Sequence, residues 1–153
     1  MIVNQKLSKN FSLHELLLTS HRKFDDAQYN PSPEVVANLK ALCVNVLQPL
    51  RDALATPITV NSGYRCPALN KSIGGASKSQ HMTGHAVDII DLTNGNEKLF
   101  KKIKALKLPF DQMIDEFGFR WVHVSFDPKR NRKQILQAKK DAKGKTIYVT
   151  PSL

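Results

Sequence analysis

The sequence predicts an α+β fold in which a small antiparallel sheet is flanked by helices. Two helix-start signals and a long apolar stripe occupy the N-terminal third, whereas short β-branched runs dominate the second half. The two kinds of segment do not alternate regularly, which argues against a βαβ fold. A chain of 153 residues is long enough to bury a hydrophobic core. We therefore expect a single domain over residues 1–153.

The first two helices are marked by caps. A capping box that begins at Ser12 predicts a short helix over residues 12–19. A second start lies at Ser32, where a serine N-cap is followed by proline and glutamate. Apolar residues then recur every three or four positions as far as Leu50, which predicts one buried stripe on a long helix. Pro49 should kink or end this helix.

The strands are indicated by short β-branched and aromatic runs bounded by turn residues. A tight turn near Gly118 should join two of them into a hairpin. A short helix is expected near residues 67–72 and a longer one from 94 to about 106. The predicted strands cover residues 57–60, 86–90, 110–117, 120–126 and 146–149, with a short helix or a strand around residues 135–136.

The formal net charge is +10, and the basic residues concentrate in residues 98–109 and 129–145. Such runs either form a solvated face or attract an anionic polymer. The first run also places Leu99, Ile103 and Leu106 on one side of a helix, so that side belongs to the core. The basic C-terminal segment, residues 129–153, carries no helix-turn-helix or zinc-finger pattern, so no specific nucleic-acid partner is expected.

Composition also suggests a compartment. No run approaches the roughly 18 apolar residues of a transmembrane helix, and the N-terminus lacks the apolar core of a secretory signal. We expect synthesis in the cytoplasm without a signal peptide. Cys43 and Cys66 fit a reducing environment, with Cys43 as a small core residue on a helix. A monomer is expected.

A polar cluster at residues 79–88 raises the question of a metal site. Catalytic zinc takes three protein ligands, usually histidine or carboxylate, and keeps a fourth position for water. His81 and His85 would share one face if this segment were helical, whereas His81 and Asp88 would pair a loop with a strand. Spacing leaves both pairings open. His123, in the middle of an apolar strand, is either a buried core histidine or a further ligand.

Several motifs together resemble the zinc D-Ala-D-Ala carboxypeptidase family, which includes D-Ala-D-Ala dipeptidases and phage endolysin peptidases. The family shares its fold with the Hedgehog signalling domain. The resemblance extends over about residues 9–126. The motifs are SGYR (62–65), LN (69–70), GG (74–75), SQHMTGHAVD (79–88) and WVH (121–123).

This resemblance implies a zinc peptidase domain in which His81, Asp88 and His123 bind Zn²⁺. His85 falls on a variable position of the motif and is expected beside the ligands or on the surface. Arg65 matches the family's arginine, and its planar guanidinium can grip a substrate carboxylate or an oxyanion.

The general base is less directly indicated. Some members of the family carry a glutamate three residues before the last histidine ligand, where this chain has Arg120. A two-residue turn at 118–119 would place Glu116 and Gln112 on the face of His123 and turn Asp115 and Asp111 away, because side chains alternate along a strand. Glu116 is then the expected base, and a one-residue change in the turn would make it Asp115. Arg65, Ser79 and Gln112 are the expected substrate-binding residues.

The sequence thus predicts a zinc-dependent peptidase that hydrolyses peptidoglycan stem peptides, as a D,D-carboxypeptidase or an endopeptidase. The expected lack of a signal peptide fits a phage cell-wall lytic enzyme that is released through a holin or carried by the virion, and it also fits a cytoplasmic dipeptidase. The alternative is a non-catalytic, zinc-containing binding module of the same fold. Arg120, which stands where some family members have the glutamate, is the feature that supports this alternative.

Overall fold

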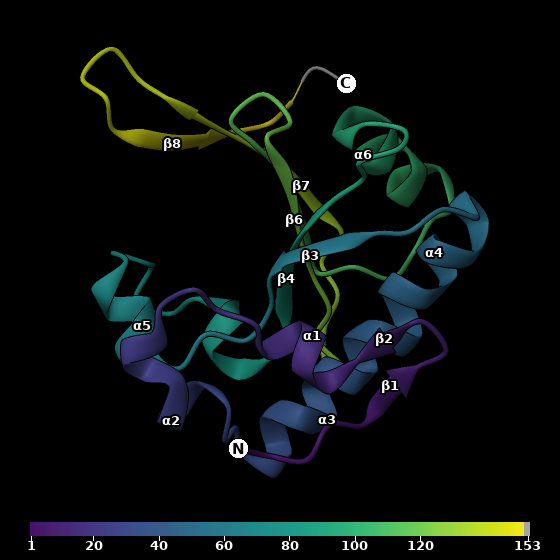
Figure 1. The fold of residues 1–153 in the computed structure, drawn as a ribbon. Helices are drawn as coiled ribbons and strands as arrows, with labels where there is room; N and C mark the ends of the chain where they lie inside the picture. The colour runs from purple at the N-terminus through teal and green to yellow at the C-terminus, as the bar shows by residue number, and fades with distance from the viewer. Residues whose placement is uncertain (152–153) are drawn as a thin grey trace.

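In a computed structural model of the protein, residues 1–151 are described; positions 152 and 153, the last two of the predicted domain and of the basic C-terminal segment, lie outside the described residues. The α+β class is confirmed (Figure 1). The strands are β1 (Lys6–Ser8), β2 (Phe11–Ser12), β3 (Thr59–Ser62), β4 (Ala86–Ile90), β5 (Gln112–Glu116), β6 (Trp121–Ser125), β7 (Gln134–Lys140) and β8 (Thr146–Val149). The helical elements are α1 (Leu13–Leu17), η1 (Arg22–Phe24), α2 (Asp25–Gln28), α3 (Pro33–Leu42), η2 (Cys43–Leu47), α4 (Gln48–Leu54), α5 (Pro67–Ser72), η3 (Gln80–Thr83) and α6 (Asn96–Ala105).

Six of the strands form one sheet in the order β3-β4-β6-β5-β7-β8. Every pair is antiparallel except β5 and β7, which run parallel, so the prediction of an antiparallel sheet misses one pair. The cause is the path of the chain: β6 ends beside the start of β5, and a loop over residues 126–133 begins β7 at that same end. The segment around residues 135–136, left open between helix and strand, is therefore a strand.

The sheet has two unlike faces. Val87 and Ile89 on β4 and Val122 and Val124 on β6 are completely buried in the core, with side chains from the N-terminal helices. The alternation of side chains sends Asp88 and its neighbours on β6 to the opposite face. The face that carries Val87 and Val122 therefore packs in the core, whereas the face that carries Asp88 and His123 does not contribute to it.

The long helix runs past Pro49 but changes its geometry. A five-residue π-helical turn, η2, separates α3 from α4, and the proline lies in the first turn of α4. A proline has no N–H and its ring crowds the carbonyl four residues earlier, so a local widening of the helix accommodates it. The apolar stripe from Val35 to Leu50 is buried as predicted.

Other boundaries shift by a few residues. Strand β3 begins at Thr59 rather than at 57, although Ile58 before it is buried. Leu99, Phe100 and Ile103 form the core face of α6. Leu106 was expected in the core, but it is 37% exposed and lies outside it. Both cysteines are buried and unpaired.

The hairpin between β5 and β6 has the predicted register but not the predicted turn. Glu116 pairs with Trp121 and Ile114 with His123, as expected. The turn spans residues 117–120, in which the N–H of Arg120 donates to the carbonyl of Glu116, so it is longer than two residues. The longer turn leaves the cross-strand partners of β5 and β6 unchanged. Glu116 therefore lies on the predicted face of the sheet, with His123.

The basic C-terminal segment is part of the sheet. Its strands β7 and β8 form an antiparallel hairpin that projects from the body of the protein as an arm, drawn yellow in Figure 1. At the opposite edge of the sheet, β3 contacts α1 (Figure 1). Across the described residues, none of the helices combines the length and apolar character needed to span a bilayer.

The loop that carries η3 is pressed against α3. Gly84 ends η3 with a φ of 78°, and a Cβ there would lie 2.7 Å from the carbonyl oxygen of Val35. Asn38 of α3 adds a hydrogen bond from its side-chain amide to the carbonyl of Thr83, at 2.9 Å. Position 84 therefore needs glycine for both its conformation and its space.

Gly84→Ala should lower the unfolding free energy of the metal-free protein by about 2–4 kcal/mol, because left-handed strain and overpacking add. Gly118→Ala is the matched control. Its φ is also positive, at 70°, but no atom lies within 4 Å of the added Cβ, so only about 1–2 kcal/mol of strain is expected. Urea unfolding measures both, and equal losses would show that the contact with α3 is not limiting.

Candidate metal centre

Three side chains from three separate elements converge on one point. His81 lies on η3, Asp88 on β4 and His123 on β6, and one ligand atom from each falls within 4.8 Å of the others. His81 Nε2 is 3.3 Å and His123 Nδ1 is 3.1 Å from the same carboxylate oxygen of Asp88. The direct pairing of Asp88 with His123 across β4 and β6 sets two of the three positions.

This donor set fits zinc. Two imidazole nitrogens and one carboxylate oxygen are the usual protein ligands of catalytic zinc, and the cleft leaves room for a fourth. His81 Nδ1 lies 2.7 Å from the carbonyl oxygen of Gly63, which can only accept, so Nδ1 carries a proton and Nε2 is the nitrogen that faces Asp88. Such a partner is typical of histidines that bind metals.

The local sequence explains why that carbonyl is in place. A Cβ at Gly63 would collide with the backbone carbonyl of Leu16 in α1. The next residue, Tyr64, donates its N–H to that same carbonyl at 2.8 Å. The glycine therefore lets β3 continue past α1 at backbone distance and aims its own carbonyl at the histidine.

The electrostatics of the cluster favour a metal ligand at Asp88. Burial alone would raise the pKa of this carboxyl, but His81 and His123 hold the pKa well below its usual range. The carboxylate is thus ionised without a metal, which is the form that binds a cation.

Arg65 reaches the cleft from the loop after β3. Its backbone N–H donates to the carbonyl of His81 at 3.0 Å, and its Nη2 lies 3.3 Å from the hydroxyl of Ser79. Its Nε is buried without a hydrogen-bond partner among the described residues. Burial lowers the pKa of this guanidinium, and Asp88 and Glu116 oppose the effect. A buried, unpaired N–H at a cleft suits an anionic ligand.

Ser79 caps the η3 helix, since its hydroxyl accepts the N–H of His81 at 3.2 Å. Together with its contact to Arg65, this makes it a positioning residue for two groups of the site. Direct binding of substrate by Ser79 stays a prediction. Gln112 lines the cleft, and its side-chain amide donates to Gln134 of β7 at 2.9 Å; its binding of substrate likewise stays a prediction.

Glu116 lies on the face of His123 and is only 8% exposed. Burial raises the pKa of its carboxyl to about 7, against the lowering effect of His123 and with a further raising effect of Asp88 and Asp115. A carboxyl that titrates near neutrality can both accept and return a proton, which is the requirement for a general base.

The other carboxylates nearby have structural partners. Asp115 is turned to the opposite face, as expected, and its Oδ1 accepts the N–H of Phe119 at 2.6 Å. Asp111 was predicted to turn away from the face of His123, and this prediction is wrong. It precedes β5, lines the cleft and binds Arg132 and the side chain of Gln80. The Arg132 guanidinium holds the pKa of Asp111 at about 2.

Sequence reasoning missed this second network. Asp111 ties Arg132 of the basic segment to Gln80, the residue before the first histidine of the cluster. No spacing pattern links these positions, because each belongs to a different element. His85 stays outside the cluster, with its Nδ1 2.7 Å from the hydroxyl of Thr83, and Arg120 is exposed in the turn.

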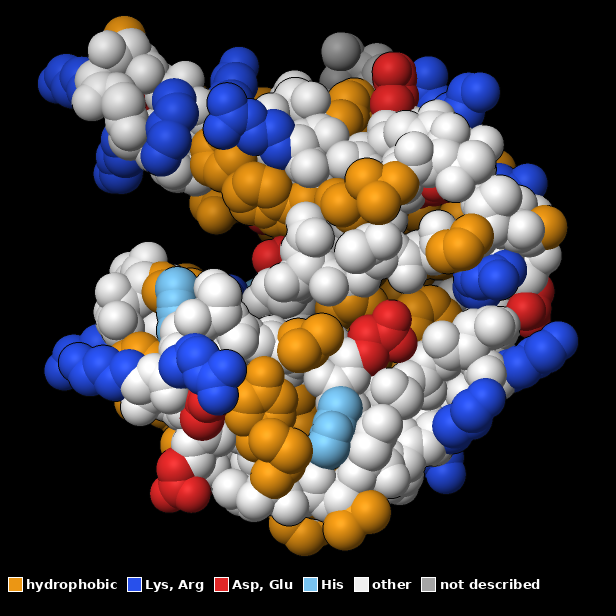
Figure 2. Space-filling view, in the orientation of Figure 1, with side chains coloured by type: hydrophobic (Ala, Val, Ile, Leu, Met, Phe, Trp, Pro, Cys, Tyr) orange, Lys and Arg blue, Asp and Glu red, His pale blue; other side chains and the backbone are white. Residues whose placement is uncertain are grey.

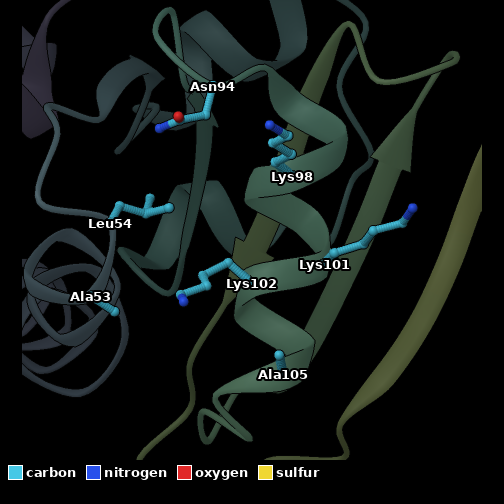
Figure 3. A pocket seen from close by; sticks show the side chains of 7 residues that line it. All are labelled: Ala53, Leu54, Asn94, Lys98, Lys101, Lys102 and Ala105. Atoms are coloured by element: carbon cyan, nitrogen blue, oxygen red, sulfur yellow. The ribbon is translucent and has the colours of Figure 1, made fainter.

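The cluster opens into a cleft of about 950 Å³. The gap below the β7–β8 arm in Figure 2 separates that arm from the lobe that carries α5. A smaller cavity of about 420 Å³ lies between α4 and α6 and is lined mainly by lysines of α6 (Figure 3). The two share no lining residue, and the larger one contains Asp88, Asp111 and Glu116, whose carboxyl pKa values are strongly shifted.

Three potential metal ligands beside a buried carboxylate, open to a cleft, are the arrangement found in metal-dependent hydrolases. The chain matches the family described as Peptidase M15 over residues 9–125 and belongs to that family. Over 44 residues, 28% of this chain, it is 52% identical to the zinc D-Ala-D-Ala carboxypeptidase of Streptomyces albus G, and this stretch is 17% of that protein's length. Family membership, the relative and the His81, Asp88 and His123 group together support zinc as the cofactor.

Replacing His123 with alanine should remove most of the zinc, because two donors no longer define a stable site. His85→Ala is the matched control and should leave close to one zinc per chain, since the His85 ring interacts with the hydroxyl of Thr83 outside the cluster. Metal analysis after gel filtration gives both values. Loss of zinc in the control and retention in His123→Ala would overturn the proposed ligand set.

Glu116→Gln should stabilise the metal-free protein at neutral pH. The folded-state pKa of Glu116 is raised from 4.5 to about 7, so ionising this buried group opposes folding, and the unfolding free energy falls as pH rises between these values. The glutamine variant lacks this cost and should gain roughly 2–3 kcal/mol at pH 8 but nothing at pH 4. Urea unfolding with a chelator at both pH values measures the difference; an equal gain at both would contradict the titration.

Proposed function

We propose that the protein hydrolyses the stem peptides of peptidoglycan at a bond next to a D-amino acid. The observation that carries the proposal is the geometry of one cleft, where the His81, Asp88 and His123 cluster meets the buried carboxyl of Glu116 and the guanidinium of Arg65, whose Nε has no partner among the described residues. A stem peptide ends in a free carboxylate, which the fork of an arginine binds in two places. The relative's D-Ala-D-Ala activity supports the same substrate class.

Each residue has a separate task in this proposal. Zinc, when bound, polarises the scissile carbonyl and makes water a better nucleophile. Glu116 takes the proton of the attacking water and returns it to the leaving amine, which its pKa near neutrality allows. Arg65 binds the terminal carboxylate or stabilises the negative charge that develops on the carbonyl oxygen.

The net charge supports a place of action at the cell wall. A charge of +10 attracts the protein to anionic wall polymers and raises its encounter rate with peptidoglycan at low salt. We place the protein among cell-wall-degrading enzymes, of which phage lytic enzymes are one kind, and take it to act as a monomer.

Digestion of purified peptidoglycan tests the proposal. The zinc-loaded protein should release new amino termini next to D-residues, and a chelator should abolish this release until zinc is restored. Mass spectrometry of the products identifies the bond. Tight binding to the wall without any released amine would show a binding module instead, and activity that survives complete removal of zinc would sink the mechanism.

Glu116→Gln should keep one zinc per chain and lose roughly 10²–10⁴-fold in turnover, the range for removal of a general base. Asp115→Asn is the control. It turns away from the metal cluster, so turnover per zinc-loaded molecule should stay within about twofold, while its altered bond to Phe119 lowers stability by roughly 1 kcal/mol. If Asp115→Asn is inactive and Glu116→Gln retains the turnover of the unmodified protein, the assignment of Glu116 as the base is wrong.

A further inference from the structure

The wall of the cleft formed by the β7–β8 arm lies outside the part of the chain that matches the family, residues 9–125. Its position follows from strand pairing. In the parallel pair Leu136 lies beside Ile114, and in the last hairpin Tyr148 lies opposite Ala138, which pairs with Glu116. Cross-strand partners share a face, so the arm continues the face that carries the proposed base and the metal cluster.

Both sides of this cleft expose apolar side chains. Tyr148 on the arm is 55% exposed, and Ile73, at the end of α5 on the opposite lobe, is 45% exposed; both line the cleft. Figure 2 shows hydrophobic side chains gathered on the side of the arm that faces the gap, with basic side chains on its outer side. Apolar groups exposed on two facing walls, with a polar rim that includes Lys78 and Arg130, are typical of a ligand-binding groove.

The distance from the metal cluster to Tyr148 sets the length of the ligand. Three strand spacings separate β6 from β8, and at about 4.8 Å each this is roughly 14 Å. An extended peptide covers about 3.3–3.6 Å per residue, so about four residues reach from the scissile bond to the arm. A single amino acid or a dipeptide is too short to touch both.

The direction of the ligand follows from Arg65. It enters the site from β3, at the edge of the sheet opposite to β8. A terminal carboxylate held by this arginine lies on the β3 side, and the amino-terminal part of the substrate then extends over β5 and β7 towards the arm.

We propose that the β7–β8 arm is the substrate-binding wall of this enzyme, and that Tyr148 is a specificity-determining residue that binds an extended peptide about four residues on the amino side of the scissile bond. This inference rests on the proposed function. It makes the substrate class an extended stem peptide rather than a free dipeptide, with contact to the arm made by the apolar face of the tyrosine ring.

Two synthetic probes test the inference: a pentapeptide stem ending in D-Ala-D-Ala, which has four residues before its last bond, and an N-blocked tripeptide with the same ending. Tyr148→Ala should lower kcat/KM for the pentapeptide about tenfold, the loss expected for one buried aromatic contact, and leave the tripeptide unchanged. Tyr148→Phe should retain nearly full activity, because the ring and not the hydroxyl makes the contact. Leu92→Ala, which removes an 80% exposed side chain outside the cleft lining, is the matched control and should change neither rate.

A binding measurement gives a second readout that needs no turnover. In a Glu116→Gln background, calorimetry should show that Tyr148→Ala weakens the pentapeptide about tenfold and the tripeptide not at all. Equal effects on both peptides, or no effect on either, overturn the inference while leaving the proposed function intact. A loss confined to substrates that carry sugars overturns the assignment to peptide. A wild-type protein that cleaves neither probe nor intact peptidoglycan contradicts the proposed function itself.

Discussion

The pairing of β4 with β6 is the constraint on which the site depends. It places Asp88 directly opposite His123 and at the same time buries the valines of both strands on the other face. A slip of one residue would send the carboxylate into the core and a valine into the cleft. The hydrophobic core therefore enforces the metal geometry, because any register that breaks one also breaks the other.

The third ligand is held by a different kind of contact. His81 sits on a short 3₁₀ turn, which has little stability of its own, and it is fixed from outside by α3 through Gly84, by the carbonyl of Gly63 and by the Asp111 network through Gln80. The site thus brings two carboxylates, Asp88 and Glu116, into a partly dry cleft before any metal is bound. His81 and His123 compensate the charge of Asp88, whereas ionising Glu116 costs folding free energy in the apo protein, a cost that a bound cation offsets.

The sequence was informative where the physics is local. The helix caps at Ser12 and Ser32 are local sequence motifs. The apolar stripe to Leu50 follows from the helical period, and the place of Glu116 on the face of His123 follows from the alternation of side chains along a strand. The turn was not predictable in this way: Phe117 and Phe119 both adopt positive φ, at 57° and 62°, which side chains with a Cβ rarely do. The bond from Asp115 to Phe119 supports that backbone, and nothing in the local pattern reveals it. The parallel β5–β7 pair and the Asp111 network were missed because both join segments that are distant in sequence.

The proposed base, Glu116, lies on β5, whereas the family resemblance suggests a glutamate at the position of Arg120. Positions 116 and 120 are the two ends of one turn, joined by the hydrogen bond from the N–H of Arg120 to the carbonyl of Glu116. A general base must lie within reach of the proton that it takes, and this requirement fixes its place in the cleft rather than its position in the motif. Arg120 is exposed in the turn and is not among the residues that line the cleft, whereas Glu116 lines the cleft and is buried, with its pKa raised to about 7. Burial on β5 therefore supplies what a residue in the exposed turn does not, a carboxyl whose proton affinity is matched to neutral pH.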